Sequence, residues 1–362
     1  MLQRLFMRKN LLLVAIALTL SLVLAEIALR IAAPDLVRSE IPLLFMTHAQ
    51  FRDDFGAIRF APHQMARSAM IYGHELETDT RFQTNDMGFV DYRDYLPPAK
   101  TGARYVFVGD SYAAGLDGER PWIPALRDRF GIQAYALGMG GTGVLGFERM
   151  LQSISRQLSF TDVVFVAITD DLYRPLWRPL VRGNGVWLCP GNMSDQACEE
   201  RWSPVVHLMR YDSTSAELIG QAREIRAEIA RKQGALRTWL QNSYVLQLAR
   251  IVVGNQLRQA GRRAALDESL EALARIRRAH PAGRIRFVHV PDRHETARGK
   301  YDIDLAPLLA GTGIDYLPVL GTCPWSMQRY LPNDNHPNSA GYEALAQCVA
   351  GMLGLERSST DR

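Results

Sequence analysis

Five short runs of apolar residues, rich in β-branched and aromatic side chains, constrain the fold of this chain most. Each run is too short for a buried helix and is typical of a strand covered on both faces. The runs are Tyr105–Gly109, Ile132–Leu137, Val163–Ile168, Ile285–Val290 and Ile314–Val319. Their alternation with helical patterns predicts an α/β fold, in which helices sandwich a doubly wound, mainly parallel five-stranded sheet.

Helical spacing of apolar residues fills the gaps between these runs. The expected helices are 147–158, Leu236–Leu257, Leu266–Arg278 and Ser339–Leu353. The expected divisions of the chain are an N-terminal segment 1–33, a lead-in 34–100 without periodicity, and an α/β domain 101–355 with an insertion at about 171–283.

The N-terminal segment carries an export pattern. Arg4, Arg8 and Lys9 precede the uncharged apolar run Leu11–Ala25, and a basic flank before such a run directs export. The run is shorter than the ~20 residues that span a bilayer, although apolar residues continue beyond it.

Two interpretations of this segment stay open. Glu26 and Arg30, which interrupt the apolar residues, are spaced to pair on a helix. Cleavage after Ala25 would place Val23 where a small residue is wanted, so no clear cleavage site is present. We therefore expect an N-terminal transmembrane helix in the inner membrane, with the N-terminus inside and the following domain in the periplasm; secretion after signal cleavage is the alternative.

Charge and cysteine content limit the classes of partner, disulfide and metal site that we expect. A net charge of +4, from 42 basic and 38 acidic residues, argues against a dedicated nucleic-acid binder. The four cysteines allow three pairings. The sequence-local choice joins Cys189 to Cys198 and Cys323 to Cys348, which an oxidising compartment permits; buried thiols are the alternative. No cysteine or histidine cluster has the spacing of zinc ligands, so we expect no metal and no cofactor.

A candidate nucleophile follows the first predicted strand, where Gly109 leads into Asp110 and Ser111. Ligands of open α/β sheets bind at the carboxyl ends of the strands. Ser111 is therefore placed to attack a substrate, and its backbone N–H is placed to face an oxyanion. The alternative is a plain turn or a helix N-cap.

A candidate base lies just before the last predicted helix, at Asp334 and His336. A serine needs a base to become a nucleophile, and histidine is the usual one. A carboxylate two residues earlier can orient the imidazole. The alternative is a helix-capping loop with a surface histidine.

A glycine-rich segment, residues 138–143, follows the second predicted strand. Glycines let backbone amides approach a ligand closely. A phosphate-binding loop is not indicated, because no Gly-Lys-Ser/Thr follows. A flexible turn is the alternative.

Together these blocks resemble the SGNH hydrolases, the GDSL-like lipase/esterase superfamily, and most closely its bacterial membrane-anchored members. The resemblance covers roughly residues 80–350. It implies that Ser111 is the nucleophile, that His336 and Asp334 complete a catalytic triad, and that Ser111 and Gly141 form the oxyanion hole, with Gly138 beside it.

One block departs from the pattern of the superfamily, which places an asparagine after the third strand; Asp170 takes that position here. An ionised carboxylate only accepts hydrogen bonds, and losing one oxyanion donor costs ~10²–10³ in turnover. Four explanations stay open: a protonated, buried Asp170, a hydrogen bond from Thr169, sufficient donation by the Ser111 and Gly141 amides, or lost catalysis.

Trp177, Arg178 and Arg182 open the insertion and are candidate substrate-binding residues. Aromatic rings with arginines bind sugars or anionic polymers. The alternative is a folded insertion in which tryptophans are core and arginines are solvated.

The resemblance implies a serine esterase that acts through an acyl-enzyme. The export pattern adds an expectation of O-acetyl esters on an envelope or exported polysaccharide. The alternatives are a catalytically impaired binding or assembly protein on the same scaffold, and an O-acetyltransferase that works with a membrane acyltransferase. A lipase would need an apolar lid, which the polar residues 171–205 do not suggest.

Overall fold

The computed structural model describes residues 2–32, 42–47, 51–52, 56–96, 102–118, 120–241 and 243–356. The chain divides into two compact units. The smaller combines residues 1–41 with 220–263, and the larger combines 42–219 with 264–362.

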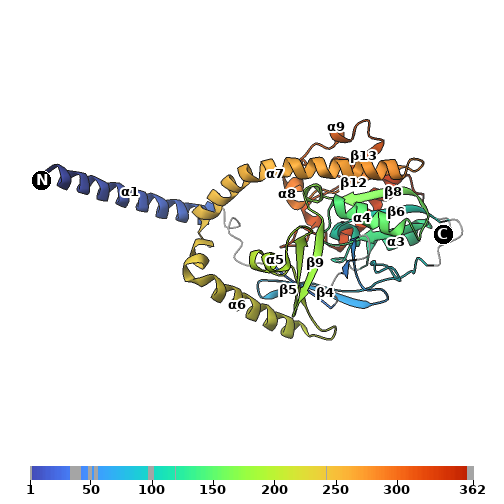
Figure 1. Ribbon diagram of the computed structural model, residues 1–362, viewed down its shortest axis with the longest axis horizontal. Coiled ribbons are helices and arrows are strands. Elements are labelled where there is room, and N and C mark those ends of the chain that lie inside the picture. The colour runs from blue at the N-terminus through green and yellow to red at the C-terminus, as the bar shows by residue number, and fades with distance from the viewer. Residues whose placement is uncertain are drawn as a thin grey trace. The chain divides into compact units, whose positions relative to one another are not determined.

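The larger unit contains the predicted five-stranded sheet, with strand order β13-β12-β8-β6-β7 (Figure 1). Every neighbouring pair in it is parallel. Its strands are β6 (Ala103–Gly109), β7 (Ala134–Gly138), β8 (Phe160–Ala167), β12 (Ile285–His289) and β13 (Ile314–Pro318). The predicted α/β class with a parallel five-stranded sheet is confirmed.

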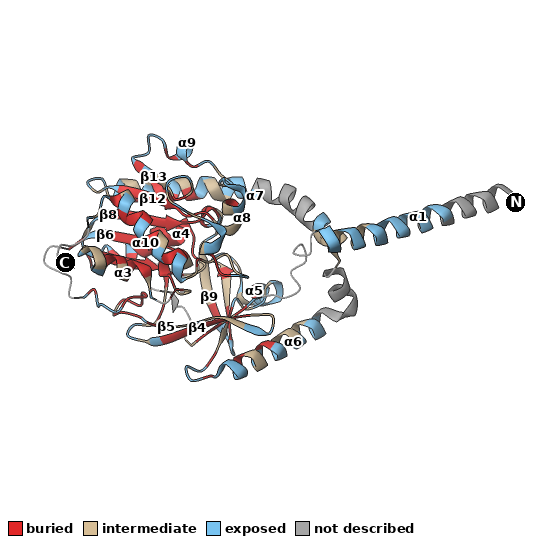
Figure 2. Ribbon diagram, turned by 180° about the vertical axis from the view of Figure 1, so that it is seen from behind, coloured by how far each residue is buried: buried red, intermediate tan, exposed pale blue. Residues whose placement is uncertain are grey.

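Helices cover both faces of this sheet, and Figure 2 shows its strands largely buried. One apolar cluster joins the sheet to α4 (Val144–Ile154) and to the C-terminal part of α7 (Tyr244–Ala279). The other cluster joins it to α3 (Trp122–Phe130) and α10 (Ser339–Leu353). Shorter helical elements are α2 (Ser111–Ala114), η2 (Thr169–Leu172), α5 (Asp195–Arg201), α8 (Arg293–Arg298), α9 (Ala306–Leu309) and η3 (Met327–Arg329).

The helices of the insertion begin and end elsewhere than the sequence predicts. The structure has α6 (Ser215–Gln241) and one continuous α7, in place of the expected helices Leu236–Leu257 and Leu266–Arg278. Residues 258–265, between the two expected helices, contain no proline and are mostly good helix formers, which explains why α7 continues through them.

A second, six-stranded sheet was not predicted. Its order is β5-β4-β1-β11-β10-β9. Its strands are β1 (Leu43–Met46), β4 (Met65–Tyr72), β5 (Glu75–Gln83), β9 (Trp177–Arg182), β10 (Gly185–Pro190) and β11 (Val206–Leu208); β2 (Phe51–Arg52) and β3 (Ile58–Arg59) pair separately. The parallel pairing of β1 with β11 joins the lead-in to the insertion.

Buried polar contacts fasten the lead-in to the parallel sheet. The Arg127 guanidinium of α3 donates to both oxygens of Asp91, at 2.6 and 3.0 Å. The Tyr95 hydroxyl donates to Asp91 at 2.8 Å and accepts from the Ala136 backbone N–H of β7 at 2.7 Å. Since Asp91 and Arg127 are buried, separating them would strand a charge away from water.

Two disulfides join Cys189 to Cys198 and Cys323 to Cys348, the sequence-local pairing. The first ties β10 to α5 within the insertion. The second ties the loop after β13 to α10, and so brackets the loop that carries His336.

The smaller unit contains α1 (Leu2–Ala32). The expected pairing of Arg30 with Glu26 is present at 2.9 Å. Glu26 also accepts from the Ser243 hydroxyl and from the Tyr244 and Val245 backbone N–H groups at the start of α7, at 3.0 to 3.1 Å.

The expected N-terminal transmembrane helix is not found. Among the residues that the structure describes, no helix is long and apolar enough to cross a membrane. The uncharged run of α1 ends at Glu26, short of the ~20 residues that a span requires.

Candidate active site

Ser111 stands at the carboxyl end of β6, as the first residue of α2. Asp110 caps this helix, with its Oδ1 accepting from the Tyr112 backbone N–H at 2.8 Å. Gly138 ends the neighbouring strand β7, and a Cβ there would lie 2.1 Å from the Ala114 backbone nitrogen. A glycine is therefore required at 138 for the close approach of α2, and this explains its place beside the site.

The structure brings the three expected triad residues together. Ser111 Oγ lies 2.7 Å from His336 Nε2. On the other side of the ring, His336 Nδ1 contacts Asp334 Oδ1, which also accepts from the His336 backbone N–H at 2.8 Å. This is the chain of contacts that a serine nucleophile, a general base and an orienting carboxylate require.

Contacts that the sequence does not reveal hold the histidine loop. The buried Tyr112 hydroxyl donates to the Asn335 carbonyl at 2.5 Å, so the residue after the nucleophile fixes the residue before the histidine. Glu77 of β5 accepts from the Asn333 backbone N–H at 2.6 Å. Asn338 caps α10 by accepting from the Gly341 N–H at 2.9 Å. The loop is thus supported by α2, α10 and the second sheet.

A second carboxylate, Asp117, faces the same imidazole. Its Oδ2 lies 3.8 Å from His336 Nδ1, and its side chain is 10% exposed. Burial would lower the pKa of His336, but Asp117, Asp334 and Asp110 raise it to about 9. Burial raises the pKa of Asp117 itself. The sequence does not reveal the role of Asp117, because nothing in the chain order places it near the histidine.

Ser111 and Gly141 line one cavity together with Gly140, Asp117 and His336. Gly141 has a φ of +77°, a conformation that favours glycine. The cavity measures about 250 Å³ and is otherwise walled mainly by apolar side chains of the second sheet. Among the described residues, no group of three or more His, Cys, Asp or Glu is arranged to hold a metal ion.

Asp170 does not enter this cavity, contrary to the expectation from the sequence. It is exposed, whereas its neighbour Asp171 is buried. The reason is a charge partner: Asp171 turns inward to contact Arg174. The explanation that requires a buried Asp170 therefore does not hold.

Thr169 does not supply the missing donor either. Its buried hydroxyl donates to Glu295 at 2.5 Å and lies 2.9 Å from His289 Nε2. Burial lowers the pKa of His289 to about 3, so this histidine is neutral and belongs to the core. Two of the four explanations remain, namely sufficient donation by the Ser111 and Gly141 backbone amides and lost catalysis.

Arg174 binds the three sequence blocks around the nucleophile to one another. Its Nη1 lies 3.0 Å from Asp110 Oδ2, 2.5 Å from Asp171 Oδ1 and 3.0 Å from the Thr142 carbonyl. Both carboxylates are fully buried. Burial would lower the pKa of Arg174, but Asp171 and Asp110 raise it above its usual value. The guanidinium therefore remains charged beside the two carboxylates, while burial and the neighbouring Asp110 raise the pKa of Asp171 well above its usual value.

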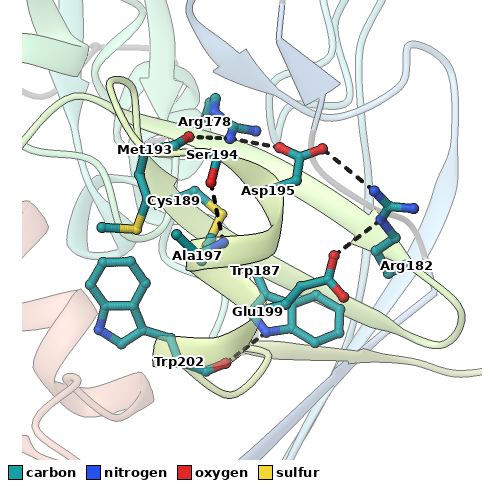
Figure 3. Close-up of a disulfide and its surroundings, with 11 residues drawn as sticks. Arg178, Arg182, Trp187, Cys189, Met193, Ser194, Asp195, Ala197, Glu199 and Trp202 are labelled. Carbon is teal, nitrogen blue, oxygen red and sulfur yellow. Dashed lines mark hydrogen bonds and ion pairs between the residues drawn. A yellow bond between two sulfur atoms is a disulfide. The ribbon is translucent and has the colours of Figure 1, made fainter.

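The candidate substrate-binding residues of the insertion lie elsewhere. Arg178 pairs with Asp195 at 2.7 Å and donates to the Met193 carbonyl, while Arg182 pairs with Asp195 and Glu199 of α5 (Figure 3). Trp177 packs against the main apolar cluster. None of the three is among the described residues that line the Ser111 cavity. The two arginines brace the hairpin of β9 and β10 against α5, and a role of the three residues in substrate binding stays a prediction.

Comparison with known proteins agrees with this arrangement. The model of the GDSL-like lipase/acylhydrolase family matches residues 105–349. The chain belongs to this family. The match begins at β6 and ends in α10, so it includes the triad, the glycine turn and the insertion.

Solved structures give weaker likenesses. A protein assigned as an acylhydrolase from Bacteroides fragilis NCTC 9343 is 15% identical, with 71% of this chain and 89% of that chain covered and a TM-score of 0.30. The acetyl xylan esterase Est2A from Butyrivibrio proteoclasticus is 11% identical, with 88% and 84% covered and a TM-score of 0.30. No curated protein gives a significant match. Likenesses this weak carry no argument about the substrate.

The carboxylates of Asp117 and Asp334 beside His336 predict that the acidic limb of the profile of kcat/KM against pH lies at alkaline pH. The imidazole must be neutral to accept a proton, and its pKa is raised to about 9, so kcat/KM for an ester should increase as the pH rises through that value. Asp117→Asn removes one negative charge, favours the neutral imidazole and should move the limb to lower pH.

Asp315→Asn, at an exposed position on β13, is the matched control and should leave the limb in place. The measurement is kcat/KM against pH for the three proteins. An acid limb that stays where it is in Asp117→Asn would show that Asp117 does not act on His336.

Arg174→Met should destabilise the protein, because Asp110 and Asp171 would remain buried without a cation. Breaking a buried ion pair from one side costs about 3–5 kcal/mol. The double variant Arg174→Met/Asp171→Asn removes one stranded charge and should recover part of that loss. Urea unfolding measures both; an Arg174→Met variant as stable as the parent would contradict the structural role given to the guanidinium.

Proposed function

We propose that this chain is a serine esterase that cleaves carboxylic esters through an acyl-enzyme on Ser111. The single observation that supports this most is the contact of Ser111 Oγ with His336 Nε2 at 2.7 Å, with Asp334 on the opposite nitrogen. Membership of the GDSL-like lipase/acylhydrolase family supports ester hydrolysis as the reaction class.

The first half-reaction forms the acyl-enzyme. Ser111 Oγ attacks the ester carbonyl carbon while His336 Nε2 takes the hydroxyl proton, and Asp334 stabilises the imidazolium. The carbonyl oxygen becomes an oxyanion beside the backbone N–H groups of Ser111 and Gly141. The bond to the leaving alcohol then breaks, and His336 returns its proton to the alcohol oxygen.

The second half-reaction releases the acyl group. Water gives a proton to His336 Nε2 and attacks the acyl carbon, and the collapse of the second oxyanion returns the proton to Ser111 Oγ. The products are a carboxylic acid and the original enzyme. An alcohol in place of water would transfer the acyl group instead, which is how the same intermediate would serve an O-acetyltransferase.

An extracytoplasmic location is part of the proposal. The basic flank and uncharged run of the N-terminal segment support export. The two disulfides support an oxidising compartment. In that location the esters of envelope or exported polysaccharides are within reach, and O-acetyl groups are one proposed substrate. The apolar wall of the cavity, however, favours an acyl group larger than acetyl.

A binding or assembly protein on this scaffold is the weaker alternative. Asp170, at the position of the superfamily's asparagine, is the feature that favours lost catalysis, but this residue is exposed and is not among the described residues that line the cavity. The triad contacts and the buried Arg174 cluster are all in place. A scaffold that only binds has no need of a base directed at a half-buried serine hydroxyl.

Labelling with an alkyl fluorophosphonate tests the proposed nucleophile. We expect an adduct on Ser111, located by mass spectrometry, with none in Ser111→Ala. His336→Ala should slow labelling by about 10²–10⁴, the usual contribution of a general base. Asp170→Asn should label at the parent rate, because Asp170 is exposed.

Two outcomes of this experiment would contradict the proposal in different ways. An adduct only in Asp170→Asn would show that the carboxylate does act on the oxyanion. An unlabelled Ser111 in every variant would favour the binding protein.

Thiol counting tests the proposed location. The chain isolated without reductant should show no thiol reactive toward iodoacetamide after denaturation, and four after reduction, since all four cysteines are bridged. Four reactive thiols before reduction would indicate a reducing compartment and overturn the extracytoplasmic assignment.

A further inference from the structure

We propose that the cavity beside Ser111 is an acyl pocket for an uncharged aliphatic chain of about six to eight carbons, larger than an acetyl group. This inference rests on the proposed esterase function and names the substrate class of that site. It concerns the acyl side of the ester, which stays attached to Ser111 after the alcohol has left.

The second sheet builds the wall of this cavity with one face. Leu44 and Met46 of β1 both line it, and alternate residues of a strand point to the same face. On the neighbouring strand β4, Met70 and Ser68 stand directly opposite them in register and line it as well. The shared face of two paired strands is thus directed at the nucleophile.

The insertion completes the wall from the other half of the same sheet. Val186 and Leu188 alternate along β10 and line the cavity. Val206 of β11 pairs with Val186 and lines it too, next to Val205. Residues from the lead-in and from the insertion therefore form one continuous apolar surface.

This surface reaches the position of the reacting carbonyl. A Cβ at Gly141 would lie 2.8 Å from Leu188 Cδ1, so the Leu188 side chain adjoins the glycine of the oxyanion hole. A carbonyl oxygen held by the Ser111 and Gly141 amides would have its attached carbon chain next to this leucine. The wall is therefore placed for the acyl chain from its first carbons onward.

The size of the cavity exceeds what an acetyl group fills. Its volume is about 250 Å³, whereas an engineered apolar cavity of about 150 Å³ holds benzene, a molecule of six carbons. A methyl group alone would leave most of the apolar wall in contact with water or empty space. A chain of about six to eight carbons matches the volume.

The charge of the lining selects against acidic acyl groups. Asp117 and His336 are the ionisable residues of the described lining. Apart from the nucleophile Ser111, the described lining offers one hydroxyl, that of Ser68, and it contains no arginine or lysine. A carboxylate at the far end of the acyl chain would enter an apolar surface with no cation to pair with it, so the chain is uncharged.

Rates on esters that differ only in acyl length test the inference on the full chain. The substrates are p-nitrophenyl esters from acetate to decanoate, whose leaving group is constant. Each methylene that enters an apolar pocket contributes about fourfold, so kcat/KM should rise about 10²-fold from acetate to hexanoate and level off beyond octanoate. A second series, the acetates of methanol to hexanol, varies the alcohol, and kcat/KM should stay nearly constant across it.

Two cavity variants and one matched control locate the effect. Leu44→Trp, at a half-buried position, should fill the pocket and move the preference to shorter chains. Met70→Ala should enlarge it and move the preference to longer chains. Val181→Trp places the same bulk on β9 at a site 47% exposed and should keep the parent profile. Fluorophosphonate labelling of each variant reports an intact nucleophile.

The outcomes separate failure of this inference from failure of the esterase proposal. A labelled Ser111 with acetate as the best ester, or with a gain that follows the alcohol series, overturns the acyl pocket and leaves the esterase standing. An unlabelled Ser111 with no ester cleaved overturns both. A profile unchanged in both Leu44→Trp and Met70→Ala overturns the location of the pocket.

Discussion

The site depends on one guanidinium. Arg174 lies between Asp110 and Asp171, both buried, and also donates to the Thr142 carbonyl. These three partners belong to the nucleophile turn, the loop after β8 and the glycine turn, which follow three different strands. A half-buried cation that holds them together fixes their mutual distances, since separating any one of them leaves an unpaired charge or carbonyl. Arg174, which holds the turns of Ser111 and Gly141 together, is not itself among the described residues that line the cavity.

The second sheet has a different task. It joins strands of the lead-in to strands of the insertion through the pairing of β1 with β11, and it supports the histidine loop through Glu77. Its remaining contribution is the apolar face directed at Ser111. The parallel sheet thus carries the triad, and the second sheet carries the surface that we propose as the acyl pocket.

The parallel sheet and the triad could be predicted because local sequence determines them. Strands buried on both faces leave uninterrupted apolar runs, and Ser111 and His336 follow from the elements beside them. The second sheet could not be predicted, because the pairing of β1 with β11 depends on residues more than a hundred positions apart, as the register Phe45 with His207 shows. Asp170 and Asp171 are adjacent carboxylates, and only the position of Arg174 decides which of them turns inward.

The division between the two sheets has a consequence for how such a protein diversifies. The segment shared with the family begins at residue 105, whereas β1, β4 and β5 precede it. The cavity-lining residues Leu44, Met46, Ser68 and Met70 are therefore encoded outside the part of the chain that carries the triad. Substitutions in the first hundred residues can change which substrates fit the cavity without altering the triad. Relatives with the same triad can therefore differ in the esters that they cleave.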